Sequence, residues 1–223
     1  MNSLGRCGVV VSSRFNSSRL PGKAIFPIDG KPLLSFLLSR ILSAESVIGV
    51  FLATTRHHSD DILEFLALEE GVSVYRGSTD DLCDRYLAAA KEFSLQTVVR
   101  ITADCPYVDG SLVDHCVNSL KSGPDFDLAT TKGEFPVGLD VEIIKVEALK
   151  KLVQSGGLGP PEKEHLTLGF HSYPEVFAIR KIQKPNHLSK YTKTYTVDDW
   201  YDYKMALESL PEFQTELIPR VKR

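Results

Sequence analysis

A cluster of positively charged and hydroxyl side chains follows the first apolar run of the chain. In VVVSSRFNSSRLPGK, residues 9–23, the cations are Arg14, Arg19 and Lys23. The polar side chains between them are Ser12, Ser13, Asn16, Ser17 and Ser18. An arginine can donate two parallel hydrogen bonds to the oxygens of one phosphate. A lysine is a flexible point charge, which can stay close to negative charge as that charge moves during a reaction. These residue types suit the binding of a small polyphosphate, and the alternative is a solvated basic turn.

This loop differs from the best-known glycine-rich phosphate cradles. It contains neither G-x-x-x-x-G-K-[ST] nor G-x-G-x-x-G, and Gly22 is its single glycine. The whole chain of 223 residues has a net charge of −3, which argues against a general nucleic-acid binder. The positive charge is therefore local, and we predict that it serves a small anionic ligand.

The elements that must position this loop alternate between strand-like and helical patterns. Four apolar, β-branched runs are expected to be strands: residues 7–13, 47–55, 72–77 and 97–104. Helical spacing follows each of them, at residues 31–44, 59–71, 79–93 and 109–123. Such alternation predicts parallel strands that are buried on both faces and joined by right-handed crossovers. We expect a doubly wound, mostly parallel α/β sheet, with ligands at the carboxyl ends of its strands.

The pattern changes after Gly123. We expect further strands at residues 127–131, 175–183 and 193–199, and helices that begin at Val146, Pro160 and Asp199. Residues 1–223 are predicted to form one domain in which residues 132–192 are an inserted lobe. This lobe carries apolar residues that we expect to be exposed: Phe135, Val137, Phe170 and Phe177. A lobe of this size buries too little surface to cover them alone, which predicts a homodimer built through it.

The cysteines and the hydropathy of the chain indicate a cytoplasmic protein. The four cysteines are scattered without a C-x-x-C pair, so we expect reduced thiols and neither a zinc site nor a disulfide framework. No apolar run approaches the ~20 residues that span a bilayer, and no secretory signal pattern is evident. We therefore expect no membrane insertion.

The loop closely resembles the ARxxSxRLPGK signature of the sugar-acid cytidylyltransferases. That family includes 3-deoxy-manno-octulosonate and acylneuraminate cytidylyltransferases and the spore-coat polysaccharide biosynthesis proteins, which are the most similar type. Further matches follow in the family's order: GKPLL (30–34), VYRGSTDDLCDRY (74–86), VVRITADCPYVD (98–109), GLDVEII (138–144), EHLT (164–167) and TVDD (196–199). The resemblance implies a Rossmann-like, GT-A-like nucleotidyltransferase fold.

The resemblance also implies an activity and its chemistry. The expected reaction transfers CMP from CTP to a nonulosonate-like sugar acid and releases pyrophosphate, for surface polysaccharide biosynthesis. Arg14, Arg19 and Lys23 match the cations that bind the triphosphate. Asp104 and Asp198 match the aspartates that hold Mg²⁺, although the neighbouring Asp199 leaves open which of the pair faces the metal. Catalysis is expected to depend on Arg14, Lys23 and Asp104.

The remaining site residues are assigned by the same resemblance. Arg76, Ser78 and Thr102, together with Ser12 and Ser13, are expected to contact the nucleotide. Asp140, Glu142 and His165 are candidates for the acceptor pocket. For the two carboxylates the alternative is an exposed hairpin, and for the histidine it is an ordinary surface position.

Two other functions compete with this interpretation. A glycosyltransferase of polysaccharide assembly would bind a nucleotide sugar through a D-x-D motif, and Asp125–Asp127 has those letters. That motif, however, precedes a predicted strand instead of ending one. A nucleotide-binding subunit without turnover is the non-enzymatic alternative, and the presence of Arg14, Lys23, Asp104 and Asp198 argues against it.

Overall fold

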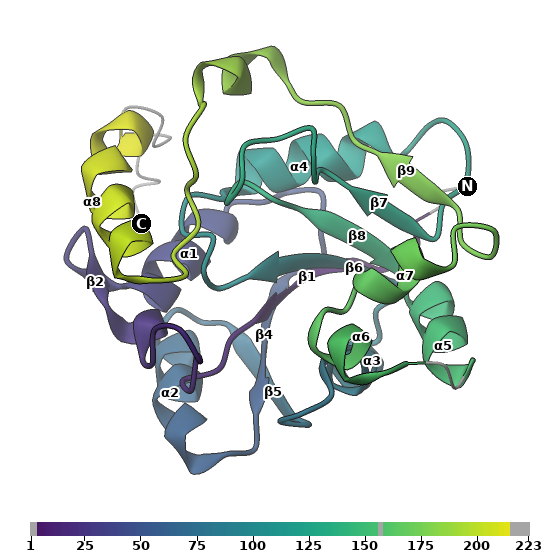
Figure 1. Ribbon diagram of the computed structural model, residues 1–223, viewed down its shortest axis with the longest axis horizontal. Coiled ribbons are helices and arrows are strands. Elements are labelled where there is room, and N and C mark those ends of the chain that lie inside the picture. The colour runs from purple at the N-terminus through teal and green to yellow at the C-terminus, as the bar shows by residue number, and fades with distance from the viewer. Residues whose placement is uncertain (1–3, 156–157, 215–223) are drawn as a thin grey trace.

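The computed structural model describes residues 4–155 and 158–214, and a seven-stranded sheet forms its centre (Figure 1). The strands are β1 (Cys7–Ser12), β4 (Val50–Thr55), β5 (Ser73–Gly77), β6 (Thr97–Thr102), β7 (Leu128–Thr130), β8 (Glu142–Lys145) and β9 (Ile179–Lys181). Their order across the sheet is β5-β4-β1-β6-β8-β7-β9. A small antiparallel hairpin, β2 (Pro27–Ile28) and β3 (Lys31–Pro32), lies outside this sheet.

The helices are distributed over both faces of the sheet. They are α1 (Leu33–Ile41), α2 (Asp61–Glu69), α3 (Leu82–Glu92), α4 (Gly110–Ser119), α5 (Val146–Gln154), α6 (Pro160–Glu164), α7 (Leu168–Ser172) and α8 (Trp200–Gln214). Three short 3₁₀ helices, η1 (Lys23–Ile25), η2 (His58–Asp60) and η3 (Asn186–Lys190), join them within the described residues.

Alternation along β1 explains why both faces are covered. Val9 and Val11 belong to the core cluster that includes residues of α1, α2, α4 and α8. Val10 points the opposite way and belongs to a second cluster, with residues of α3, α5 and α7. Since successive side chains of a strand alternate between faces, a run of valines buries both sides and needs helices on each. The predicted doubly wound, mostly parallel sheet is confirmed.

The second half of the chain extends the sheet with one reversed strand. β8 pairs antiparallel with both β6 and β7, and β9 pairs parallel with β7. Residues 132–192 thus supply two strands, β8 and β9, to the main sheet. A separate lobe in this range stays a prediction, as does the homodimer.

The exposure expected for three aromatic residues of this range is wrong. Phe135, Phe170 and Phe177 are 6%, 0% and 4% exposed, whereas Val137 is 54% exposed. The rings of Phe170 and Phe177 lie 4.9 Å apart, in the cluster that also contains residues of α3 and α5. They are covered within the chain because α7 and the segment before β9 fold onto the face of the sheet that α5 occupies.

The expected strand at residues 193–199 is not formed either. This segment is extended, but its contacts are isolated hydrogen bonds, from Tyr195 N to Val137 O (2.7 Å) and from Val197 N to Asp104 O (2.8 Å). Gly138, with φ of +91°, allows the segment to pass, because a Cβ there would lie 2.2 Å from Thr196 N. Residues 193–199 therefore reach the carboxyl end of β6 without joining the sheet.

Two smaller expectations concern the membrane and the thiols. None of the helices in the described part of the chain is long and apolar enough to cross a bilayer. Cys7, Cys83, Cys105 and Cys116 are free, buried thiols, as expected for a chain without a disulfide framework.

Candidate active site

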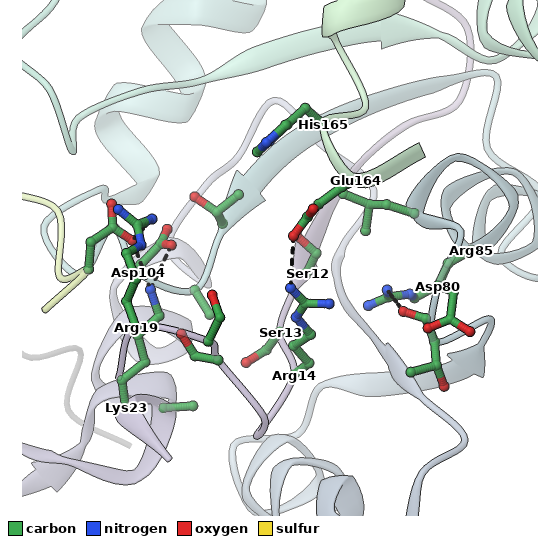
Figure 2. A pocket seen from close by; sticks show the side chains of 18 of the residues that line it. Ser12, Ser13, Arg14, Arg19, Lys23, Asp80, Arg85, Asp104, Glu164 and His165 are labelled. Carbon is green, nitrogen blue, oxygen red and sulfur yellow. Dashed lines mark hydrogen bonds and ion pairs between the residues drawn. The ribbon is translucent and has the colours of Figure 1, made fainter. Parts of the chain in front are cut away.

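A cavity of about 570 Å³ lies at the carboxyl ends of β1 and β6 (Figure 2). The segments that line it are the loop after β1, the residues that lead into α3, the end of β6, α6 with His165, and Asp198. The loops after β1, β5 and β6 meet here, as the parallel arrangement predicts, because parallel strands bring their carboxyl ends to one edge.

The loop after β1 is held in place by a buried carboxylate. Asp60, at the end of η2, is 1% exposed, and its Oδ1 accepts a hydrogen bond from Phe15 N at 2.8 Å. Its Oδ2 accepts hydrogen bonds from Thr54 Oγ1 and from Thr55 N and Oγ1. Burial by itself raises the pKa of Asp60, but these hydrogen bonds outweigh it, and the pKa lies below the usual value. The charged carboxylate thereby fastens the loop to the end of β4.

Lys23 occupies the centre of the site. Gly22, with φ of +74°, turns the chain so that Lys23 starts η1. The Lys23 ammonium donates to Asp104 Oδ2 (2.9 Å), Val197 O (2.7 Å) and Asp198 Oδ1 (3.1 Å). Arg19 Nη2 lies 2.9 Å from the same oxygen of Asp198. Residues far apart in the sequence are thus gathered around one positive charge.

Asp104 and Asp198 form a pair of carboxylates that could hold a cation. Their oxygens converge on one ammonium group, so they can both approach a single cation. Mg²⁺ commonly uses one or two carboxylates with phosphate and water oxygens, and the pair fits this donor set. No group of three or more His, Cys, Asp and Glu side chains within residues 4–155 and 158–214 is arranged to bind a metal. Any metal here would need ligand oxygens from substrate or water.

The charge state of Asp104 suits the binding of a cation. Burial raises the pKa of the carboxyl, but the Lys23 ammonium and the hydrogen bonds from Thr102 and Lys23 lower it more. The pKa of Asp104 consequently lies below its usual value, and the side chain is charged at neutral pH.

Asp198 and Asp199, which the sequence left as alternatives, have different contacts. Asp198 points to Lys23 and Arg19 and lines the cavity. Asp199 Oδ1 instead accepts a hydrogen bond from Asp202 N at 2.9 Å, the usual role of a residue before a helix. The structure therefore brings Asp198 to the cavity and leaves Asp199 at the start of α8.

Other candidates on the cavity wall are Ser12, Ser13, Arg14, Thr102 and His165. Arg14 Nη2 lies 3.1 Å from Glu164 Oε1, so this ion pair joins the loop after β1 to α6.

Two expected nucleotide contacts lie outside the cavity lining. Arg76 donates to Asp61 Oδ1 (2.6 Å), Glu64 Oε2 (2.9 Å) and the backbone oxygens of Thr55 and His57. Ser78 Oγ accepts from Asp81 N at 3.1 Å, just before α3. The structure gives both side chains local partners and does not bring them to the other candidates.

The two acceptor-site carboxylates also lie outside the lining. Asp140 is half-buried and accepts from Gly138 N at 3.1 Å; burial raises its pKa more than this bond lowers it. Glu142 is 1% exposed and forms ion pairs with Arg100 and Lys132, so an exposed hairpin is wrong for it. Arg100 itself lines the cavity, so Glu142 contacts a lining residue without lining the cavity itself.

Sequence reasoning missed several lining residues, among them Arg85, Arg100 and Glu164. Arg100 could have been found from its spacing, because it precedes Thr102 by two residues on β6 and so faces the same side. Glu164 stands in the EHLT stretch that was recognised. Arg85 stands in the recognised stretch VYRGSTDDLCDRY (74–86), but nothing in the sequence distinguished it there from the other polar residues.

Asp125 and Asp127, the D-x-D motif of the glycosyltransferase alternative, have partners within the fold. Asp125 pairs with Lys145, and Asp127 Oδ2 accepts from Ala178 N at 2.8 Å. Neither residue lines the cavity.

Comparisons with known proteins agree with this architecture. Residues 9–216 match the family model described as cytidylyltransferase. The spore coat polysaccharide biosynthesis protein SpsF of Bacillus subtilis is 26% identical over 200 residues, which are 87% of this chain and 82% of that protein.

Two solved structures have a similar fold. A cytidylyltransferase from Leptospira borgpetersenii has a TM-score of 0.84 at 32% identity, over 93% of this chain and 87% of that one. CMP:2-keto-3-deoxy-manno-octonic acid synthetase in complex with CTP has a TM-score of 0.73 at 16% identity, over 93% and 99%. The second similarity concerns the fold alone. The family match over nearly the whole length confirms the resemblance seen in the sequence: this chain belongs to the cytidylyltransferase family and is a nucleotidyltransferase.

Proposed function

We propose that the protein transfers CMP from CTP to a sugar acid, in a Mg²⁺-dependent reaction that releases pyrophosphate and serves surface polysaccharide biosynthesis. The observation that carries this proposal is that Lys23, Asp104 and Asp198 converge at the carboxyl ends of the parallel strands. A cation and two carboxylates at one point suit a reaction in which negative charge moves along a triphosphate.

Two relatives support the choice of substrate. The matched Bacillus protein is named for spore coat polysaccharide biosynthesis. The synthetase that shares the fold is named for a CMP-linked sugar acid and was solved with CTP. We extend both descriptions to this chain as part of the proposal.

The residues on the cavity wall would have different roles in the reaction. Arg14, Arg19 and the hydroxyl groups of Ser12 and Ser13 would bind phosphate oxygens. An acceptor hydroxyl would attack the α-phosphorus and release its proton to solvent, forming a new P–O bond while the bond between the α-phosphorus and the bridging β-phosphate oxygen breaks. Pyrophosphate then leaves with the charge that Lys23 stabilises.

Asp104 and Asp198 would hold Mg²⁺ beside the α-phosphate. When bound, such an ion neutralises phosphate charge and lowers the pKa of the acceptor hydroxyl. Asp104 is suited to this role because its pKa is low, and no proton has to leave it before a cation binds. His165, which is exposed on the wall beside α6, would approach the acceptor.

Pyrophosphate release tests the proposal. The protein is incubated with CTP, Mg²⁺ and a panel of sugar acids, and each reaction is repeated with ATP, GTP and UTP and with excess chelator. We expect release only with CTP, a suitable acceptor and Mg²⁺. Release without an acceptor, or equal release with all four nucleotides, would contradict the proposal. The competing glycosyltransferase would consume a ready-made nucleotide sugar and release no pyrophosphate.

A further inference from the structure

Arg85 is a buried arginine on the cavity wall with unusually few partners. The residue is 3% exposed and lines the cavity from α3. Its Nη2 donates to Thr79 O over a long 3.4 Å, and its Nε has no hydrogen-bond partner. No carboxylate within residues 4–155 and 158–214 forms an ion pair with it. Asp60 and Asp80 act on Arg85 through their charge but form no hydrogen bond with it. A buried guanidinium without a hydrogen-bonded carboxylate is costly, so this position favours an additional acceptor, such as an oxygen of a bound anion.

Among the described residues, the other arginines that line the cavity each form an ion pair with a carboxylate, which Arg85 does not. Their partners are Glu164 for Arg14, Asp198 for Arg19 and Glu142 for Arg100. Arg85 is the exception among the arginines that line the cavity in the described part of the chain.

Rigid packing fixes the place of Arg85. The helix begins after Asp81, whose Oδ1 accepts from Asp84 N at 2.9 Å. The next side chain, Tyr86, donates from its hydroxyl to Val10 O of β1 at 3.2 Å. Gly77 lets the arginine stem lie close to β5, because a Cβ there would be 2.9 Å from Arg85 Cγ. The guanidinium is therefore positioned before any ligand arrives.

A second cation lies on the same side of the cavity. Figure 2 shows the guanidinium groups of Arg14 and Arg85 directed toward one another, opposite Lys23 and Arg19. Burial lowers the pKa of Arg85 and the positive charge of Arg14 also lowers it, whereas Tyr86, Asp60 and Asp80 act in the opposite direction. Glu164 neutralises Arg14 alone. Arg14 has one ion-paired carboxylate and Arg85 has none among the described residues, so the two neighbouring cations form a site for an additional anion.

We propose that Arg14 and Arg85 together bind a phosphate group of the triphosphate, and that Glu164 occupies Arg14 until this phosphate replaces it. The identity of the anion as part of a nucleotide rests on the proposed function. The anion site itself rests on the geometry of the two arginines. Arg85 thus extends the triphosphate site from the loop after β1 to α3.

Binding of inorganic tripolyphosphate tests the anion site without any base or acceptor. Its dissociation constant is measured by calorimetry for the wild type and for Arg85→Gln, Arg85→Lys and Glu164→Gln. Lys91→Gln is the matched control, since it removes one charge from an exposed position of the same helix away from the cavity. Circular dichroism establishes that each variant is folded.

We expect Arg85→Gln to weaken tripolyphosphate binding about ten-fold or more, because charge-assisted hydrogen bonds are lost. Arg85→Lys should weaken it less, since the charge remains. Glu164→Gln should tighten binding roughly two- to five-fold by removing a competing, exposed carboxylate. The control Lys91→Gln should bind as the wild type does.

The proposal is wrong if Arg85→Gln binds tripolyphosphate as tightly as Lys91→Gln does. If that variant also binds cytidine more weakly than the wild type does, Arg85 is a contact of the base instead. Tripolyphosphate contains neither base nor sugar, so these results stand whether or not the protein proves to use CTP.

Discussion

Replacing Lys23 by methionine should destabilise the protein through one identifiable carboxylate. In the wild type the ammonium contacts Asp104 at 2.9 Å and Asp198 at 3.1 Å, and the Lys23 side chain is 13% exposed. After the substitution Asp198 keeps Arg19 at 2.9 Å, whereas Asp104 loses its ion-pair partner. A partly buried charge left without a partner costs about 1–3 kcal/mol. For a chain of this size, a loss of ~2 kcal/mol lowers Tm by about 4–8 °C.

A double mutant and a change of pH identify the cause. Adding Asp104→Asn to Lys23→Met removes the unpaired charge, so we expect most of the lost Tm to return. The pKa of Asp104 is lowered in the folded protein. Stability from its charged form is therefore present above the unfolded pKa of about 3.9 and is lost as the pH falls through the lower folded value. The difference between wild type and Lys23→Met should thus be large at pH 7 and shrink below about pH 4.

The assay is thermal unfolding followed by circular dichroism, with chelator present so that no metal stabilises either protein. Lys23→Arg is the control that keeps a positive charge. Equal Tm values for wild type and Lys23→Met at pH 7 would refute the reasoning. So would a double mutant that is no more stable than Lys23→Met, because the loss would then not come from Asp104.

Four further results are expected. Asp104→Asn should keep the fold and lose about 100-fold or more of pyrophosphate release, as a metal-binding carboxylate would. Asp198→Asn should raise the Mg²⁺ concentration needed for half-maximal rate, whereas Asp199→Asn should leave it unchanged, because Asp199 contacts the start of α8. Arg76→Gln should lower Tm but keep the KM for CTP, since its donors are taken by α2 and by backbone oxygens near the end of β4. Light scattering at micromolar concentration should give twice the 24.8 kDa chain mass, as expected for a homodimer.

Contrary results are equally specific. Near-normal turnover by Asp104→Asn would remove it from the metal site, and equal Mg²⁺ dependence of the Asp198 and Asp199 variants would remove Asp198. A raised KM for CTP in a stable Arg76→Gln variant would return Arg76 to the nucleotide site. A mass near that of one chain would exclude the dimer. Charged substitutions at Phe135 or Phe170 cannot test the dimer, because both residues are buried within the chain.

The four parallel strands of the first half of the chain could be predicted because the sequence pattern of each strand and of the helix after it is local. β1, β4, β5 and β6 are apolar runs followed by helices, and this alternation determines both their type and their burial. β8 could not be placed in this way. Its insertion between β6 and β7, antiparallel to both, depends on pairing between distant segments. The same holds for residues 193–199, which look like a strand but have isolated contacts with Val137 and Asp104.

The candidate site shows the same division between local and distant information. The sequence by itself determined the residue types at the ends of β1 and β6, and hence the cationic loop and Asp104. The tertiary structure decided which side chains are left for a ligand. Arg76 and Arg85 are both arginines near the same loop. Arg76 forms ion pairs with two carboxylates of α2, whereas Arg85 is buried and forms no ion pair among the described residues. The reason is physical: a side chain's type states what it can bind, but its neighbours in space determine whether that capacity is already used.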